Sequence, residues 1–372
     1  MLFIRVSGGF AALLLAAAAC AGGEADRSAA DSTTAGDSIR ARSDTVFSAD
    51  SAAGDTSRPD SAPGIVPVDV KPDSLRYESV PGKAATDTSV AAKPVAAKPA
   101  PLVWPEPPAP LPGALLPASR IVAYYGNPLS KRMGILGEIP PEQMMTRLEK
   151  TAAEWQAADS TRPVLPALHL IATVAQGKPG RDGLYRLRMS DSIIERVAGW
   201  AEQKGWLLFL DIQPSHSTVE AELPHLLEYL KRPYVHLGLD PEFAMTGRGD
   251  GALPGKKIGT MDAREINWAI DTVAKLVTAY NLPPKVLVIH RFTERMITNY
   301  DKIRRDPRVQ VVIDMYGFGP PSLKRSTWRY VIQREPVQFT GVKLFYKNDK
   351  PLLTPAKALE TFKPEPIYIQ YQ

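Results

Sequence analysis

The sequence is poor in the residues and motifs that mark several common protein classes. Cys20 is the only cysteine among 372 residues, so an intrachain disulfide and a thiolate metal site are both excluded. The five histidines form no H-x-H or H-E-x-x-H pattern. No G-x-G-x-x-G follows the first predicted strand and no G-x-S-x-G appears, so a dinucleotide fold and a serine nucleophile elbow are not indicated. The net charge is only +5, without basic runs interleaved with aromatics, which argues against nucleic acid as a partner.

The N-terminus has the pattern of a secretory signal. Arg5 is an early cation, an apolar run passes through Leu13–Leu15, and small residues precede Cys20. A cysteine after leucines and alanines resembles the lipobox of bacterial lipoproteins. The resemblance implies that residues 1–20 are a lipoprotein signal with a lipidated Cys20. The protein would then be extracytoplasmic, attached by lipid to the cell membrane or outer membrane. The alternative is an ordinary cleaved signal with an incidental cysteine.

Residues 21–117 are dominated by Ala, Asp, Ser, Thr and Pro. Few aliphatic or aromatic side chains are available to bury, so this segment is predicted to be a disordered linker that stiffens towards polyproline II near its end. The predicted domains are therefore the signal (1–20), the linker (21–117) and a catalytic domain (118–372), which we expect to be monomeric.

Apolar runs alternate with amphipathic helical patterns from residue 120 onward. The predicted strands are 120–126, 163–175, 205–214, 234–242, 285–292, 309–317, 339–346 and 366–372. The predicted helices are 141–158, 190–205, 218–231, 262–280, 294–304, 323–333 and 355–362. Eight such units in about 250 residues are typical of the α/β (β/α)₈ TIM barrel. An open doubly wound sheet is the alternative. An eighth helix is missing, and the proline-rich segment before Arg120 is a candidate to cover that gap.

Polar side chains follow the apolar part of four consecutive strands. Asp240 and Glu242 lie two positions apart at the C-terminal tip of the fourth strand, so strand alternation predicts that they share a face. The third, fifth and sixth strands end in Asp211 and Gln213, in His290, and in Asp314 and Tyr316. Each acid alone is equally consistent with a structural ion pair. Together they predict an acidic pocket at the carboxyl end of the barrel, where TIM barrels keep their chemistry.

The Asp240-Pro241-Glu242 sequence resembles the end of the chitinase signature of glycoside hydrolase family 18, and family 25 lysozymes also carry D-x-E there. The first-strand AYYG and sixth-strand DMYGF support the same resemblance. It implies that Glu242 is the general acid, Asp240 its partner, and Tyr316 a ligand of a substrate acetamido group. Two further aspartates of family 18 and the first-strand acid of family 25 are absent here. The chain is also similar to bacterial secreted proteins with DIQP and LDPE strand ends.

The sequence therefore predicts a glycoside hydrolase that acts on an envelope or extracellular polysaccharide without a cofactor or metal. Glycoside hydrolysis needs one protonated carboxyl and one base or nucleophile. The predicted catalytic residues are Glu242, Asp240, Asp211 and Asp314, and the predicted substrate-binding residues are His290, Tyr316, Gln213 and Tyr125.

Two other functions stay open. Asp211, Asp240, Glu242, His290 and Asp314 also suit a metal-dependent hydrolase, since they are hard ligands for Mg²⁺, Mn²⁺ or Zn²⁺. The second alternative is that the barrel is a non-catalytic, envelope-tethered glycan-binding module. His169 and His236 lie early in their strands and are expected to pack in the interior. The long loop 244–261, with Arg248, Lys256 and Lys257, is either a mobile lid or anion clamp or a solvated insertion.

Overall fold

Eight parallel strands close on themselves in the computed structural model, which describes residues 104–372. They are β1 (Arg120–Gly126), β2 (Val164–Ala175), β4 (Leu207–Ile212), β5 (Val235–Leu239), β7 (Lys285–Arg291), β9 (Val309–Met315), β10 (Phe339–Leu344) and β11 (Tyr368–Tyr371). Strand β1 pairs with both β2 and β11, which completes the barrel. The predicted TIM-barrel fold is confirmed. The signal, Cys20 and the linker as far as residue 103 lie outside the described residues.

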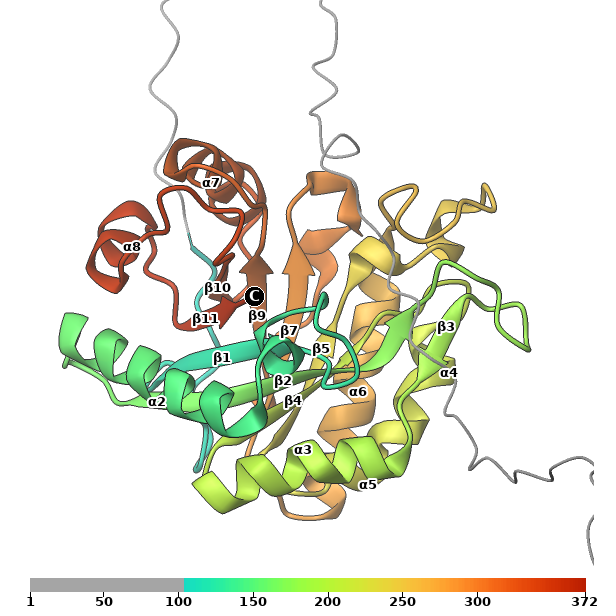
Figure 1. The fold of residues 1–372 in the computed structure, drawn as a ribbon. Coiled ribbons are helices and arrows are strands. Elements are labelled where there is room, and N and C mark those ends of the chain that lie inside the picture. The colour runs from blue at the N-terminus through green and yellow to red at the C-terminus, as the bar shows by residue number, and fades with distance from the viewer. Residues whose placement is uncertain (1–103) are drawn as a thin grey trace, which may run out of the picture. The chain divides into compact units, whose positions relative to one another are not determined.

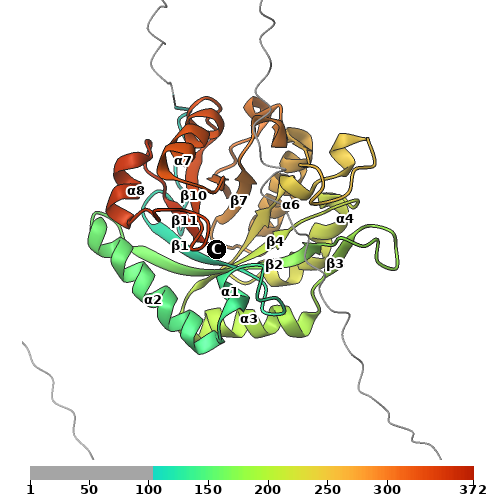
Figure 2. The same cartoon turned by 45° about the horizontal axis from the view of Figure 1, so that its top comes forward.

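Helices surround the barrel (Figures 1 and 2). They are α1 (Ile135–Glu138), α2 (Pro141–Ala158), α3 (Asp191–Lys204), α4 (Val219–Glu222), α5 (Leu227–Leu230), α6 (Ala263–Ala279), α7 (Pro321–Trp328) and α8 (Pro355–Thr361). Helix α6 buries Ile266, Ile270, Val273 and Val277, which recur at helical spacing and face the strands. None of the helices in residues 104–372 is long and apolar enough to cross a membrane.

The prediction of a helix over residues 294–304 is wrong. This connection consists of two short 3-10 turns, η5 (Glu294–Met296) and η6 (Tyr300–Lys302), with β8 (Ile297–Thr298) between them. The buried Arg291 guanidinium donates to the backbone oxygens of Thr293 and Glu294, and Asn299 adopts a left-handed conformation with φ 54°. Both features break a continuous helical hydrogen-bond pattern. Strand β8 instead pairs with β6 (Met261–Asp262) beside the barrel.

Two other predicted helices are interrupted. The segment predicted as 218–231 contains the 3-10 turn η2 (Leu223–Leu226) between α4 and α5, and Pro224 in this turn cannot donate a helical hydrogen bond. The helix predicted as 323–333 begins earlier, at Pro321, and continues beyond α7 as a π-helical turn, η7 (Arg329–Gln333). A three-residue strand, β3 (Arg186–Arg188), adds antiparallel to the end of β2.

The segment before β1 packs against the bottom of the barrel through Leu115 and Leu116. Leu116 is fully buried with inward-facing residues at the amino ends of the strands, including Ile121, Phe209 and Val286. The Gln310 side chain accepts hydrogen bonds from the Leu115 and Leu116 amides, each at 3.1 Å. Residues that the sequence assigns to the end of the linker thus help to close the bottom of the barrel and leave only its carboxyl end open for chemistry.

Candidate functional site

A pocket of about 300 Å³ opens at the carboxyl ends of the barrel strands. We call it the mouth pocket. Its polar lining residues include Gln213, Asp240, Glu242 and Lys343. Six aromatic rings also line it: Tyr125, Phe243, Phe292, Tyr316, Phe318 and Phe345. The combination of convergent carboxyl groups and flat apolar rings is typical of a small-molecule or sugar site.

Asp240 and Glu242 both reach the mouth pocket, but not as two residues of one strand. Strand β5 ends at Leu239, and Pro241 begins the 3-10 turn η3 (Pro241–Phe243). Proline has no amide to continue the strand pairing. The Asp240 carboxylate instead caps the turn by accepting a hydrogen bond of 3.2 Å from the Glu242 amide. The expectation that strand alternation places both acids on one face is therefore wrong, although the turn delivers both to the same pocket.

Burial and, to a smaller extent, the neighbouring Asp240 carboxylate together raise the pKa of Glu242 to about 7. A hydrogen bond of 2.5 Å from the Tyr316 hydroxyl to Glu242 Oε2 opposes this rise. Burial also raises the pKa of Asp240 to about 6, with Asp211 acting in the same direction and His290 and Lys343 against it. Two carboxyl groups in the pocket therefore titrate near neutrality, as acid–base chemistry requires.

The floor of the mouth pocket is a connected polar network. Gln213 Nε2 donates to Asp240 Oδ2 at 3.3 Å and to the Tyr125 hydroxyl at 3.2 Å. The Tyr125 hydroxyl donates to Asp211 Oδ2 at 3.1 Å, one layer deeper. The ammonium of Lys343 lies 3.7 Å from the centre of the Tyr125 ring. Burial lowers the pKa of Lys343, while the surrounding carboxylates act against this shift.

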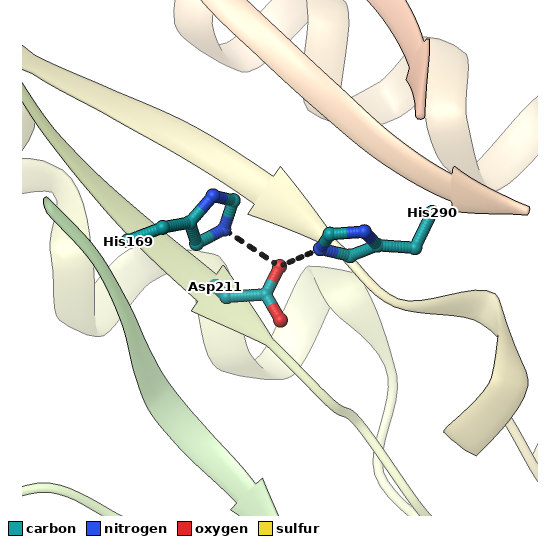
Figure 3. Close-up of side chains that lie close together, drawn as sticks. All are labelled: His169, Asp211 and His290. Atoms are coloured by element: carbon teal, nitrogen blue, oxygen red, sulfur yellow. Dashed lines mark ion pairs between the residues drawn. The ribbon is translucent and has the colours of Figure 1, made fainter. Parts of the chain in front are cut away.

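Beneath this floor lies a fully buried group that we call the His–Asp–His cluster: His169 on β2, Asp211 on β4 and His290 on β7. The three side chains point toward one another (Figure 3), with His169 Nε2 at 3.3 Å and His290 Nε2 at 3.4 Å from Asp211 Oδ1. His290 Nδ1 lies 3.1 Å from Asp314 Oδ2 on β9.

The surroundings shift the pKa values of the three groups of the cluster in different directions. Burial would raise the pKa of Asp211, but His290 and His169 outweigh it and hold that pKa well below its usual range. Burial lowers the pKa of His169 to about 4. Burial and Lys343 also act to lower the pKa of His290, yet Asp211 and Asp314 raise it to about 9. Without a further cation, this geometry favours an imidazolium at His290 that is paired with the Asp211 carboxylate.

The structure thus divides the predicted site residues into two layers. Five of them line the mouth pocket: Tyr125, Gln213, Asp240, Glu242 and Tyr316. Asp211, His290 and Asp314 lie beneath its floor and do not line it. Gln213 and Tyr125 connect the two layers through the bonds described above.

Sequence reasoning missed two residues of this region. Lys343 lines the mouth pocket. Its position within the apolar run of β10 could have indicated a functional or paired residue, because lysine is rarely buried without a partner. His169 is interior, as expected, but takes part in the cluster. Arg248, from the predicted lid, instead pairs with Asp250 at 2.7 Å and donates to the Ile258 oxygen. The pocket's peripheral cations come from elsewhere: Lys131, Arg132 and Lys347.

Comparison with protein-family models and with curated proteins gives no match for this chain. The geometry of the mouth pocket and of the layer beneath it therefore carries the functional argument.

Proposed function

We propose that the barrel is a glycoside hydrolase that acts on an envelope or extracellular polysaccharide. The observation that carries this proposal is Glu242: a buried carboxyl with a pKa raised to about 7, placed beside Asp240 in an aromatic-lined pocket. Cleavage of a glycosidic bond needs a carboxyl that is still protonated near neutrality to assist the leaving oxygen, and a second carboxyl as base or nucleophile.

In this proposal Glu242 is the general acid. The Tyr316 hydroxyl, which donates to Glu242 Oε2, orients the carboxyl and leaves Oε1 for the proton that is transferred. Asp240 is the second carboxyl, because it lines the pocket, whereas Asp211 and Asp314 lie under the floor. The pKa of Asp240, about 6, lies below that of Glu242, about 7, so Asp240 ionises first and Glu242 still holds its proton near neutrality.

The remaining lining residues suit a sugar. Aromatic rings such as Phe292 and Phe318 offer flat apolar faces for the C–H side of a pyranose, and Gln213 and Lys343 offer polar groups for hydroxyls. Lys131 and Arg132 add positive charge to the lining, favourable for a polymer with carboxylate substituents. Lipid attachment through Cys20 would hold the domain where such polymers occur.

The test is a screen of the purified protein against peptidoglycan, chitin and galactosamine-type polymers, with release of reducing ends as the readout. The proposal expects cleavage of at least one of them and its loss in Glu242→Gln. Binding of a polymer in the mouth pocket without any release of reducing ends would replace the hydrolase with a glycan-binding module. Cleavage that Glu242→Gln leaves intact would place the acid elsewhere.

A further inference from the structure

Three potential metal-ligand atoms converge in the interior of the barrel. His169 Nε2, His290 Nε2 and Asp211 Oδ1 all lie within 4.8 Å of one another, and all three side chains are fully buried (Figure 3). Both nitrogens contact Asp211 Oδ1 at ion-pair distance, but among residues 104–372 none of the three atoms makes a contact with regular hydrogen-bond geometry. Buried polar atoms without such partners are costly, and several aimed at one point indicate a ligand that satisfies them together.

The two separations measured from Asp211 Oδ1 match those around a small tetrahedral cation. An ion with bonds of about 2.0–2.1 Å to nitrogen and oxygen holds neighbouring ligand atoms roughly 3.3 Å apart. The observed separations from Asp211 Oδ1 are 3.3 Å to His169 Nε2 and 3.4 Å to His290 Nε2. We propose that the His–Asp–His cluster is a binding site for one divalent transition-metal ion of the zinc type. Two imidazoles and one carboxylate are a donor set suited to zinc.

The groups behind the ligands are those that a metal site needs. His290 Nδ1 lies 3.1 Å from Asp314 Oδ2, so the ring can donate its Nδ1 proton to this carboxylate and turn the Nε2 lone pair toward Asp211. His169 Nδ1 lies 2.6 Å from the Tyr368 hydroxyl, which can accept its proton in the same way once the Gln370 amide, 2.9 Å from the same nitrogen, turns its oxygen toward it. Such outer partners fix the tautomer and orientation of metal-bound histidines.

Gly238 on β5 leaves the space in which the three side chains of the His–Asp–His cluster meet. Strand β5 lies between β4 and β7, and Gly238 is the direct neighbour of Asp211 on β4 and of Val288 on β7. A Cβ at this position would lie 2.3 Å from Asp211 Oδ1 and 2.5 Å from His169 Nε2. Any other residue would push the ligand atoms apart, so the glycine keeps the interior open where His290 reaches across to Asp211.

The proposed ion lies below the mouth pocket, and none of its three ligands lines that pocket. Through Asp211 and the Tyr125 hydroxyl it would fix the floor on which Gln213 and Asp240 rest. This inference does not rest on the proposed hydrolase, since none of the observations behind it involves Glu242.

The test is a titration of untagged, chelator-treated protein with ZnCl₂, followed by calorimetry and by thermal unfolding. We expect one ion per chain and, at zinc concentrations near 100 times Kd, a Tm increase of at least about 5 °C. Co²⁺ should bind with the intense visible absorption of a tetrahedral site. Asp211→Asn and His169→Ala should each lose saturable binding, and Asp314→Asn should weaken it about 10–100-fold.

His225→Ala is the matched control, because His225 is exposed on η2 and should leave binding unchanged. Glu242→Gln should also bind zinc like the wild type, which separates this inference from the proposed function. Absence of saturable zinc binding would overturn the inference, and so would binding that survives in both Asp211→Asn and His169→Ala. If either variant fails to fold, the wild-type stoichiometry and the Co²⁺ spectrum decide: an octahedral spectrum or a stoichiometry well below one refutes the site.

Discussion

Replacing Glu242 with glutamine is expected to stabilise the fold at neutral and alkaline pH. The folded pKa of about 7 lies above the ordinary value of 4.5, so the folded state holds this proton more tightly than the unfolded chain does. The contribution of this proton to wild-type stability is therefore fully present below about pH 4.5 and is lost as the pH rises through about 7. Above that pH the folded protein carries a buried charge that glutamine does not have.

The size of the effect follows from the same pKa change. At about 1.4 kcal/mol per pKa unit, the rise corresponds to about 3 kcal/mol, of which Asp240 supplies a part. We expect a gain of about 1–3 kcal/mol at pH 8, or roughly 3–10 °C in Tm. The glutamine oxygen still accepts the hydrogen bond from Tyr316, so packing is preserved.

Urea unfolding at pH 4.5 and at pH 8 measures this effect. The gain should be clear at pH 8 and shrink towards zero at pH 4.5. Glu154→Gln is the control, because Glu154 is exposed on α2 and its replacement should change stability little at either pH. A Glu242→Gln variant that is no more stable than the wild type at pH 8, or equally stabilised at both pH values, would refute the reasoning that burial holds this proton.

Three further changes have defined outcomes. Lys343→Met removes a cation that lowers the pKa of both Asp240 and Glu242, so the alkaline limb of the pH–activity profile should move to higher pH; an unmoved limb contradicts this assignment. Leu116→Ala should cost about 2–5 kcal/mol in urea unfolding, because it empties a fully buried position at the bottom of the barrel; a cost below 1 kcal/mol would mean that this segment does not close it. Cys20→Ser should abolish labelling of cells with a fatty-acid analogue; equal labelling would exclude a lipid anchor at this residue.

The barrel was predictable because its strands are nearly continuous apolar runs that alternate with helical patterns. The prediction failed where a single residue interrupts a pattern. The apolar spacing of 294–304 resembles a helix, but Asn299 in a left-handed conformation and the capture of two backbone oxygens by Arg291 stop it. Such interruptions depend on tertiary contacts that hydrophobic periodicity does not encode.

The sequence predicted which side chains face the inside of the barrel, but not how far below its mouth each of them lies. Strand alternation correctly places Asp211 and Gln213 on the inner face, yet only Gln213 reaches the mouth pocket. Depth depends on how the strands are staggered around the barrel, and this stagger arises from closure of the whole sheet. For the same reason the meeting of His169 with His290 could not be read from either strand: it requires the glycine on the strand between them.

Turnover by Glu242→Gln, measured beside the wild type and Glu154→Gln on a polymer that the screen identifies, tests the central claim most directly. The account predicts that Glu242→Gln lowers kcat by about 10²–10⁴-fold, since general acid–base assistance is worth that much, while affinity for the polymer stays close to that of the wild type. Glu154→Gln should keep full activity. A Glu242→Gln variant that turns over substrate at the wild-type rate would contradict the account.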